Sequence, residues 1–189
     1  MRKLLKILVI TSGKILGPIF FDGSYLKGKW FDGKNKDLGW QGWLWVLQGI
    51  WFQKILGFNR RIKVPISYNF RLNSLKNLMM DPNELDNLQS PGCYFQNPDA
   101  KIYIGKDTKV GPNVCIITRN HDFEDLDSYT RSSDVCIGDG CWLGSNSIIL
   151  PGINLGNKVI VAAGSVVTKS FDSNCVIGGN PARIIKKLE

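Results

Sequence analysis

Aliphatic residues return at every sixth position through the C-terminal half of the chain. The register runs through Ile104, Val110, Ile116, Ile137, Leu143, Ile149, Leu155, Val161 and Val167. A period of six fits neither an amphipathic helix, whose period is 3.6, nor a half-buried strand, whose period is two. It does suit a chain wound into flat coils of parallel strand, in which equivalent side chains stack in the interior. The pattern therefore predicts a β-solenoid.

Two further features keep the same register. Glycine or alanine follows the aliphatic residue at positions 105, 111, 138, 144, 156 and 162. We interpret these residues as corners, where the backbone adopts angles that a Cβ would penalise. A second position, two residues before the aliphatic one, is also expected to face inward; it is occupied by Thr108, Val114, Cys141, Ser147, Ile153, Val159 and Ser165.

The six-residue repeat is interrupted between Ile116 and Ile137, which are 21 positions apart instead of six. Fifteen residues are thus inserted as a loop that leaves the coil. Long loops on a rigid scaffold usually carry function. This loop holds His121, the one histidine of the chain, which makes His121 the candidate catalytic residue.

The pattern resembles that of the hexapeptide-repeat acyltransferases over roughly residues 90 to 189. The motifs that carry the resemblance are Cys141-Trp142-Leu143-Gly144-Ser145, Leu150-Pro151-Gly152, Ala163-Gly164-Ser165-Val166-Val167-Thr168-Lys169 and Gly179-Asn180-Pro181-Ala182-Arg183. The resemblance implies an all-β fold, a left-handed parallel β-helix of triangular cross-section with an extended loop. We expect this domain, with its C-terminal tail, over residues 91–189. Residues 1–90 are expected to form a basic, Trp-rich region that is irregular and partly helical.

The resemblance further implies an acetyl-CoA-dependent O-acetyltransferase that modifies a sugar hydroxyl, as in surface-polysaccharide synthesis. An alcohol is a weak nucleophile at neutral pH, so a base must take its proton during direct transfer; an imidazole suits that role. By resemblance this base is His121, and Asp122, Glu124 or Asp125 is expected to orient its ring. The expected lining of the active site is Asn120, Asp122, Trp142 and Ser145, with Ser145 beside the thioester.

The family's contacts with coenzyme A carry over to this chain residue by residue. They fall on Ser145, Ala163, Thr168, Lys169, Arg183 and Lys186. Small residues let the pantetheine arm run along the coil, and basic side chains bind phosphates. In the family, trimers form and each active site lies between adjacent subunits, so we expect a homotrimer. No metal is expected.

Several alternatives stay open at this point. A zinc carbonic anhydrase of this fold needs three histidine ligands, which one histidine per chain does not supply. A non-catalytic β-helix scaffold would need neither the loop nor the tail. Among acceptors, an amino-sugar nucleotide, serine and a xenobiotic compete with a sugar hydroxyl. A covalent route through Cys115 or Cys136 is not required, since the family transfers the acetyl group directly.

The net charge of +8 is unevenly distributed. Residues 1–80 hold 14 basic and 3 acidic side chains, whereas residues 81–189 hold 10 and 13. No nucleic-acid-binding module is recognisable, so the basic region is expected to face an anionic membrane surface or a phosphorylated substrate. Five cysteines without a CxxC pair indicate reduced thiols, as in the cytosol.

Four of the six tryptophans lie within residues 40–51. Wound as a helix, this segment has two apolar stripes; one holds Trp40, Trp43, Leu44, Leu47, Trp51 and Ile55, and the other Trp45, Phe52 and Leu56. One stripe is expected to pack on the solenoid, and the other on a neighbouring subunit or in lipid headgroups. No apolar run reaches 18 residues, so no spanning helix is predicted.

The first ten residues resemble a signal peptide only faintly. Lys6 interrupts their apolar run and no small-residue cleavage site follows, so we expect the segment to be retained. The protein is therefore predicted to be cytoplasmic, with residues 1–60 as the region that would contact the inner face of the membrane.

Overall fold

The computed structural model describes residues 2–32 and 39–189. Met1 and residues 33–38, which belong to the predicted N-terminal region, lie outside the described residues. The chain divides into two compact units, Met1–Phe70 and Arg71–Glu189, called here the N-terminal unit and the β-helix unit. The β-helix unit begins about twenty residues before the expected boundary near residue 90, because β1 and β2 already pair with later strands.

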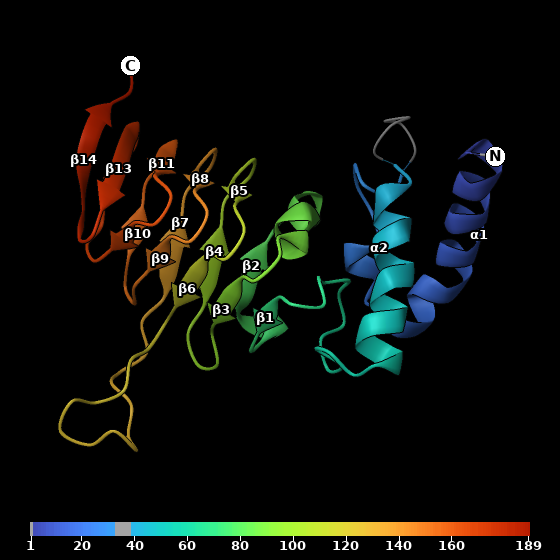
Figure 1. The fold of residues 1–189 in the computed structure, drawn as a ribbon, viewed down its shortest axis with the longest axis horizontal. Coiled ribbons are helices and arrows are strands. Elements are labelled where there is room, and N and C mark those ends of the chain that lie inside the picture. The colour runs from blue at the N-terminus through green and yellow to red at the C-terminus, as the bar shows by residue number, and fades with distance from the viewer. Residues whose placement is uncertain (1, 33–38) are drawn as a thin grey trace. The chain divides into compact units, whose positions relative to one another are not determined.

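Within the described residues 71–189, three sheets form the faces of the β-helix unit (Figure 1). Sheet A has the order β1-β3-β6-β9-β12, sheet B has β2-β4-β7-β10, and sheet C has β5-β8-β11-β13-β14. The chain visits the sheets in turn, so each strand pairs in parallel with a strand one coil away, and only β14 runs antiparallel. The expected fold class, an all-β left-handed parallel β-helix after a partly helical N-terminal region, is confirmed.

The strands are short, as flat coils require. Their bounds are β1 Arg71–Leu72, β2 Leu78–Met80, β3 Tyr94–Gln96, β4 Ile102–Ile104, β5 Lys109–Val110, β6 Cys115–Ile117, β7 Val135–Ile137, β8 Trp142–Leu143, β9 Ile148–Ile149, β10 Asn154–Leu155, β11 Val159–Val161, β12 Val166–Val167, β13 Cys175–Gly179 and β14 Ala182–Lys187.

The core lies inside these faces. All the aliphatic positions of the predicted register are buried, and so is the second inward set from Thr108 to Ser165. They form one column on each face rather than a single column, because successive positions fall on successive sheets. On sheet A, for example, Ile116 pairs with Ile149, and Ile149 with Val167. Each such buried side chain contributes about 1.5–3 kcal/mol.

The first exposed edge of sheet C is covered by a 3₁₀ segment, η4 (Pro82–Gln89). The buried Asn87 amide donates to the carbonyl of Thr108 at 2.9 Å and accepts from the backbone N–H of Val110 at 2.9 Å. These two bonds replace the ones that a preceding strand would make to β5. The stack is thus closed to edge-to-edge pairing at this point.

The glycines that follow the aliphatic positions have a different role from the one we expected. Gly105 and Gly144 do not adopt positive φ; the left-handed residues come two positions later, at Asp107 and Asn146. A Cβ on Gly105 would lie 2.4 Å from the carbonyl carbon of Gly138, and one on Gly144 would lie 2.6 Å from the carbonyl oxygen of Val161. These glycines are therefore needed because adjacent coils approach too closely for a side chain.

The N-terminal unit is built on two packed helical segments. They are α1 (Arg2–Phe20) and α2 (Gln41–Gly49), which continues as a π-helix (η2, Ile50–Ile55); a short 3₁₀ turn, η1, covers Gly23–Tyr25. Trp43 is buried, and its Nε1 donates to the carbonyl of Phe31 at 3.1 Å. Gly13 of α1 lies against Trp43, so part of the first tryptophan stripe packs on α1.

The other expected contacts of the tryptophan segment are not all met within this unit. Trp51, Ile55 and Leu56 stay about half exposed, at 53%, 58% and 52%. Among the helices in the described ranges, none has the length and hydropathy needed to cross a bilayer.

We expect Gly105→Ala to destabilise the β-helix more than Gly164→Ala. Gly164 has φ +70 but open space where a Cβ would lie, so alanine costs only about 1 kcal/mol of backbone strain there. At Gly105 the new methyl group overlaps the next coil, and the coils must separate, at a cost of roughly 3 kcal/mol or more. Thermal or urea unfolding of both variants measures the difference; equal losses would contradict the close-approach explanation.

Candidate active site

The inserted loop leaves the stack where the sequence predicted it, between β6 on sheet A and β7 on sheet B (Figure 1). Its first residue is tied to the preceding coil, since the backbone N–H of Thr118 donates to the carbonyl of Gln96 at 3.0 Å. Its two arms also meet at the root, where the N–H of Ser133 donates to the carbonyl of Thr118 at 2.8 Å. The loop therefore departs from a fixed point on the β-helix.

A short antiparallel ladder holds His121 within this loop. His121 pairs with Tyr129, and the flanking hydrogen bonds run from Thr130 N–H to the Asn120 carbonyl (2.9 Å) and from Asp122 N–H to the Ser128 carbonyl (3.2 Å). His121 and Tyr129 are thus a pair without mutual hydrogen bonds, the arrangement in which opposite side chains approach most closely. Their rings lie 4.5 Å apart between centroids, tilted by 37°.

The imidazole has a defined protonation pattern in its neutral form. Its Nδ1 lies 2.7 Å from the carbonyl oxygen of Leu126. A carbonyl oxygen only accepts hydrogen bonds, so Nδ1 carries the proton and donates it to Leu126. The neutral ring then keeps a lone pair on Nε2, and this nitrogen can accept a proton from a neighbouring hydroxyl group.

Two of the three carboxylates expected to orient this ring, those of Asp122 and Asp125, bond to backbone N–H groups of the loop. Asp122 accepts from the backbone N–H of Glu124 at 2.9 Å, and Asp125 accepts from the N–H of Asp127 at 3.1 Å. The carbonyl of Asp125 also accepts from the N–H and the hydroxyl of Ser128, which closes the loop tip. These bonds shape the turn that presents the Leu126 carbonyl to His121.

The two cysteines nearest the loop are poor nucleophiles. Burial raises the pKa of the Cys115 thiol, and burial together with the nearby Asp134 carboxylate raises the pKa of Cys136. A raised pKa leaves less thiolate at neutral pH, and the thiolate is the reactive form. The covalent alternative through these residues is therefore disfavoured.

Ser145, Ala163 and Arg183 gather at the corner between sheets C and A. The N–H of Gly164 donates to the carbonyl of Ser145 at 2.9 Å, which stacks the Ala163 corner directly on the Ser145 corner. Arg183 pairs with Gly178, and a Cβ on Gly178 would touch the Cβ of Ala162 at 3.0 Å. Three of the residues expected to contact coenzyme A thus lie along the edge between sheets C and A of the β-helix unit.

Trp142 and Lys186 lie on the outer surface of sheet C. Trp142 is 56% exposed, and it pairs with Ile160, which pairs with Val176, which in turn pairs with Lys186. The aromatic and the basic side chain therefore stand in one cross-strand row, separated by two intervening strands. This row runs beside the Ser145 edge and ends at the C-terminal hairpin of β13 and β14.

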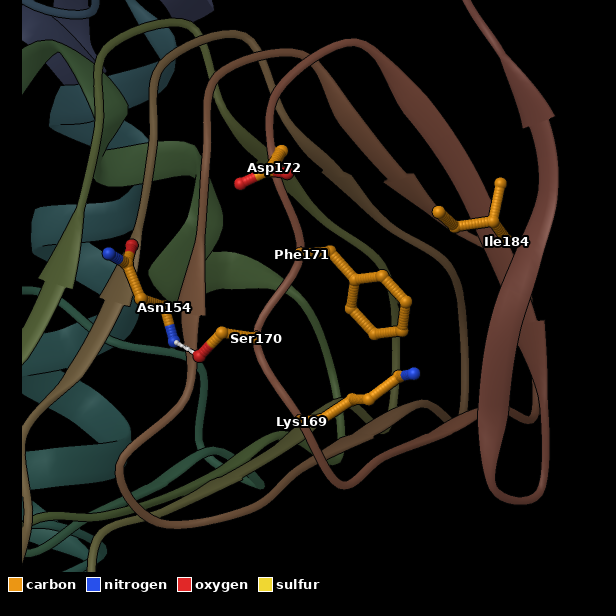
Figure 2. A pocket seen from close by; sticks show the side chains of 6 residues that line it. All are labelled: Asn154, Lys169, Ser170, Phe171, Asp172 and Ile184. Atoms are coloured by element: carbon orange, nitrogen blue, oxygen red, sulfur yellow. Dashed lines mark hydrogen bonds between the residues drawn. The ribbon is translucent and has the colours of Figure 1, made fainter.

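Thr168 and Lys169 lie elsewhere, at the corner where the chain leaves sheet A. This is the corner from which the His121 loop departs on an earlier coil, since β6, β9 and β12 are neighbours in sheet A. Lys169 borders a cleft lined by Asn154, Lys169, Ser170, Phe171, Asp172 and Ile184. Figure 2 shows Phe171 and Lys169 pointing towards β14, which carries Ile184.

Within one chain, the expected site residues therefore form two groups. Asn120, His121 and Asp122 lie on the loop at the edge between sheets A and B, shared with Thr168 and Lys169. The second group lies on sheet C and at the edge between sheets C and A; it consists of Trp142, Ser145, Ala163, Arg183 and Lys186. Leu126 and Tyr129 were not predicted as site residues, because nothing in the spacing of the loop shows which residues face each other across it. Among the described residues, no cluster of His, Cys, Asp and Glu is arranged to hold a metal ion.

A model described as the hexapeptide repeat of succinyl-transferase matches residues 134–169. A protein named as a putative lipopolysaccharide biosynthesis O-acetyl transferase, WbbJ of Escherichia coli K12, is 42% identical over 114 residues, or 54% of this chain and 58% of that protein. The matched repeat lies within the β-helix unit, and the chain is similar in sequence to proteins named as acetyltransferases.

The chain spans about half the length of the curated relatives that it matches. Galactoside O-acetyltransferase of E. coli K12 is 31% identical over 93 residues, 48% of this chain and 46% of that one. Among solved structures, a maltose O-acetyltransferase from Clostridium difficile 630 is similar, with 27% identity and a TM-score of 0.49 over 98% of this chain and 89% of that one.

Proposed function

We propose that the protein is an acetyl-CoA-dependent O-acetyltransferase of a sugar hydroxyl, working in surface-polysaccharide biosynthesis. The observation that carries this proposal is the imidazole of His121, whose Nδ1 bonds to a backbone carbonyl and whose Nε2 is thereby left as the basic nitrogen. The loop that holds it is the one insertion in a regular β-helix. Its relatives support the reaction class, since WbbJ and galactoside O-acetyltransferase are both named as O-acetyltransferases.

The transfer itself needs one proton shuttle. Nε2 of His121 takes the proton of the sugar hydroxyl as its oxygen attacks the thioester carbon. The new ester C–O bond forms, the C–S bond breaks, and the imidazolium returns the proton to the departing thiolate. A proton-taking group of this kind is expected to contribute about 10²–10⁴-fold in rate.

The second group of residues, together with Thr168 and Lys169 from the edge of the His121 loop, is assigned to the donor. Ser145 is proposed to donate to the thioester oxygen as negative charge develops there, beside Trp142. Ala163 leaves room for the pantetheine arm, while Lys169, Arg183 and Lys186 bind phosphates and Thr168 adds a polar contact. Thr168, Lys169, Arg183 and Lys186 are exposed and Ser145 is half-buried in the structure, so these side chains can be reached by a large soluble donor.

A sugar acceptor is favoured because the chain is similar to a lipopolysaccharide O-acetyl transferase over a longer segment than to a chloramphenicol acetyltransferase. The WbbJ match covers 54% of this chain, whereas chloramphenicol acetyltransferase from Morganella morganii matches over 33%. An amino-sugar nucleotide, serine or a xenobiotic therefore remains the second choice of acceptor. The acceptors can be distinguished by measuring release of the free thiol of coenzyme A. The panel contains oligosaccharides, nucleotide sugars, serine and chloramphenicol.

We expect His121→Ala to lower kcat by roughly a hundredfold or more, because the acceptor hydroxyl loses its base. Binding of coenzyme A, measured by calorimetry, should persist, since the proposed donor contacts lie on other residues. A melting curve checks that the fold is intact. Unchanged turnover would refute the proposed mechanism.

The two groups of site residues support an oligomer. In one chain they lie on different edges of a three-sided stack, so we infer that a complete site combines the His121 loop of one subunit with the Ser145 edge of the next. A homotrimer with threefold symmetry supplies such pairs in a closed ring.

Mixed oligomers test this arrangement. His121→Ala and the double variant Arg183→Glu/Lys186→Glu should each be inactive alone. Reassembled together in equal amounts, they are expected to regain about a quarter of wild-type activity, because one neighbouring pair in four combines two intact halves. If both groups acted within one chain, the mixture would stay inactive.

We also infer that the N-terminal unit contacts an anionic membrane surface at the inner face. Outer positions of α1 are apolar and well exposed, with Leu4 at 65%, Leu8 at 56%, Ile15 at 64% and Ile19 at 69%. These positions share one helical face, while Val9, Gly13 and Gly17 form the buried side against α2. Residues 1–80 carry 14 basic side chains against 3 acidic ones, which complements anionic lipid.

Vesicle binding measures this contact. The wild-type chain is expected to bind phosphatidylglycerol-rich vesicles and to bind neutral phosphatidylcholine vesicles only weakly. Leu8→Gln/Ile15→Gln should weaken binding by about tenfold or more, since two apolar side chains no longer enter the interface. Ile185→Gln, a matched change at a residue that is 65% exposed on β14, should bind as wild type does. Equal binding of the two variants would rule out α1 as the contact.

A further inference from the structure

We propose that Tyr129, backed by Arg119, is the positioning residue that keeps His121 in its Nδ1–H form. This inference rests on the proposed function, because it assigns a role in presenting the base. The structure offers three linked contacts for it: imidazole to phenol ring, phenol ring to guanidinium, and guanidinium to the β-helix.

The first contact comes from the backbone. The antiparallel bridge places Tyr129 directly opposite His121, and the phenol ring lies 4.5 Å from the imidazole at a tilt of 37°. Since His121 is otherwise exposed, this ring is the flat surface that limits rotation of the imidazole about its side-chain bonds. With rotation limited, Nδ1 stays in line with the Leu126 carbonyl at 2.7 Å.

The second and third contacts anchor Tyr129. The guanidinium carbon of Arg119 lies 3.9 Å from the centre of the Tyr129 ring, and Nη1 of Arg119 forms an ion pair with Asp99. The backbone N–H of Arg119 donates at 3.2 Å to the Gln96 side chain, which belongs to β3. Through Arg119, the aromatic contact in the loop is tied to the rigid stack.

This arrangement explains how an exposed loop can hold a base without a carboxylate partner. The Leu126 carbonyl selects which nitrogen bears the proton, and the Tyr129 ring keeps the imidazole where that carbonyl can be reached. Contact with the ring needs its flat face and not its hydroxyl. Phenylalanine should therefore replace Tyr129 with little loss, whereas a small polar residue should not.

The test uses the fact that His121 is the one histidine of the chain. In untagged protein labelled with ¹⁵N in histidine, the imidazole gives a single pair of nitrogen signals whose shifts report which nitrogen is protonated. Wild type and Tyr129→Phe should show the Nδ1–H form when the ring is neutral. Tyr129→Ser should show a mixture of both tautomers, with kcat lowered by about fivefold or more and unchanged affinity for coenzyme A.

Arg119→Gln should give the same changes in smaller measure. Arg131→Gln is the matched control, because Arg131 is an exposed arginine of the same loop. It should leave both the tautomer and kcat as in wild type.

Each outcome bears on one of the two proposals. An unchanged Nδ1–H signal in Tyr129→Ser overturns the positioning role, and so does equal damage in Tyr129→Phe. A shifted tautomer with unchanged kcat supports the positioning role but contradicts His121 as the base.

Discussion

The hydrogen-bonded contact between successive coils is the constraint on which the rest of this structure depends. Each coil bonds to the one before and the one after it, so all three must follow the same path. The path leaves no space at the corners, where Gly105 and Gly144 lie against the backbone of the next coil. Eighteen residues separate Leu143 from Val161 on sheet C, and the same number separates Ile149 from Val167 on sheet A. Extra residues cannot stay in such a coil, and the fifteen that follow β6 are therefore expelled as one loop.

An expelled segment has to satisfy its own backbone groups, and this requirement shapes the candidate site. The loop does so with a short ladder at its root and an Asp125 turn at its tip. The turn leaves the Leu126 carbonyl directed at His121. A carbonyl differs from a carboxylate as a partner, because it fixes the tautomer of the imidazole without adding a full negative charge beside it. Asp122 and Asp125 thereby serve the shape of the loop, and His121 is held by a main-chain carbonyl.

The sequence predicted the repetitive part of the molecule well, because the hexad register expresses a repeated physical need. Positions such as Leu143 and Val167 are buried as expected, and the break before Ile137 is the loop. The role predicted for Gly105 was wrong. Close approach of coils and a positive φ both select glycine, and a sequence does not distinguish these two causes. The start of the stack at Arg71 was missed because η4 replaces a strand there and the register is lost. The contacts across the loop were beyond sequence analysis because the pairing of His121 with Tyr129 depends on where the chain turns, and several acidic residues could have closed the turn equally well by spacing alone.

The distribution of side chains over the β-helix carries a final consequence for its assembly. A three-sided stack is convex, so side chains on different edges of one chain diverge and do not enclose a common space. The loop with His121 and the edge with Ser145 are such a pair, and each coil adds residues to its own edge without bringing the two closer. Lengthening the stack therefore cannot complete a site that needs both. A neighbouring copy, set with one edge against the other, can complete it, and this favours assembly as a condition of the chemistry.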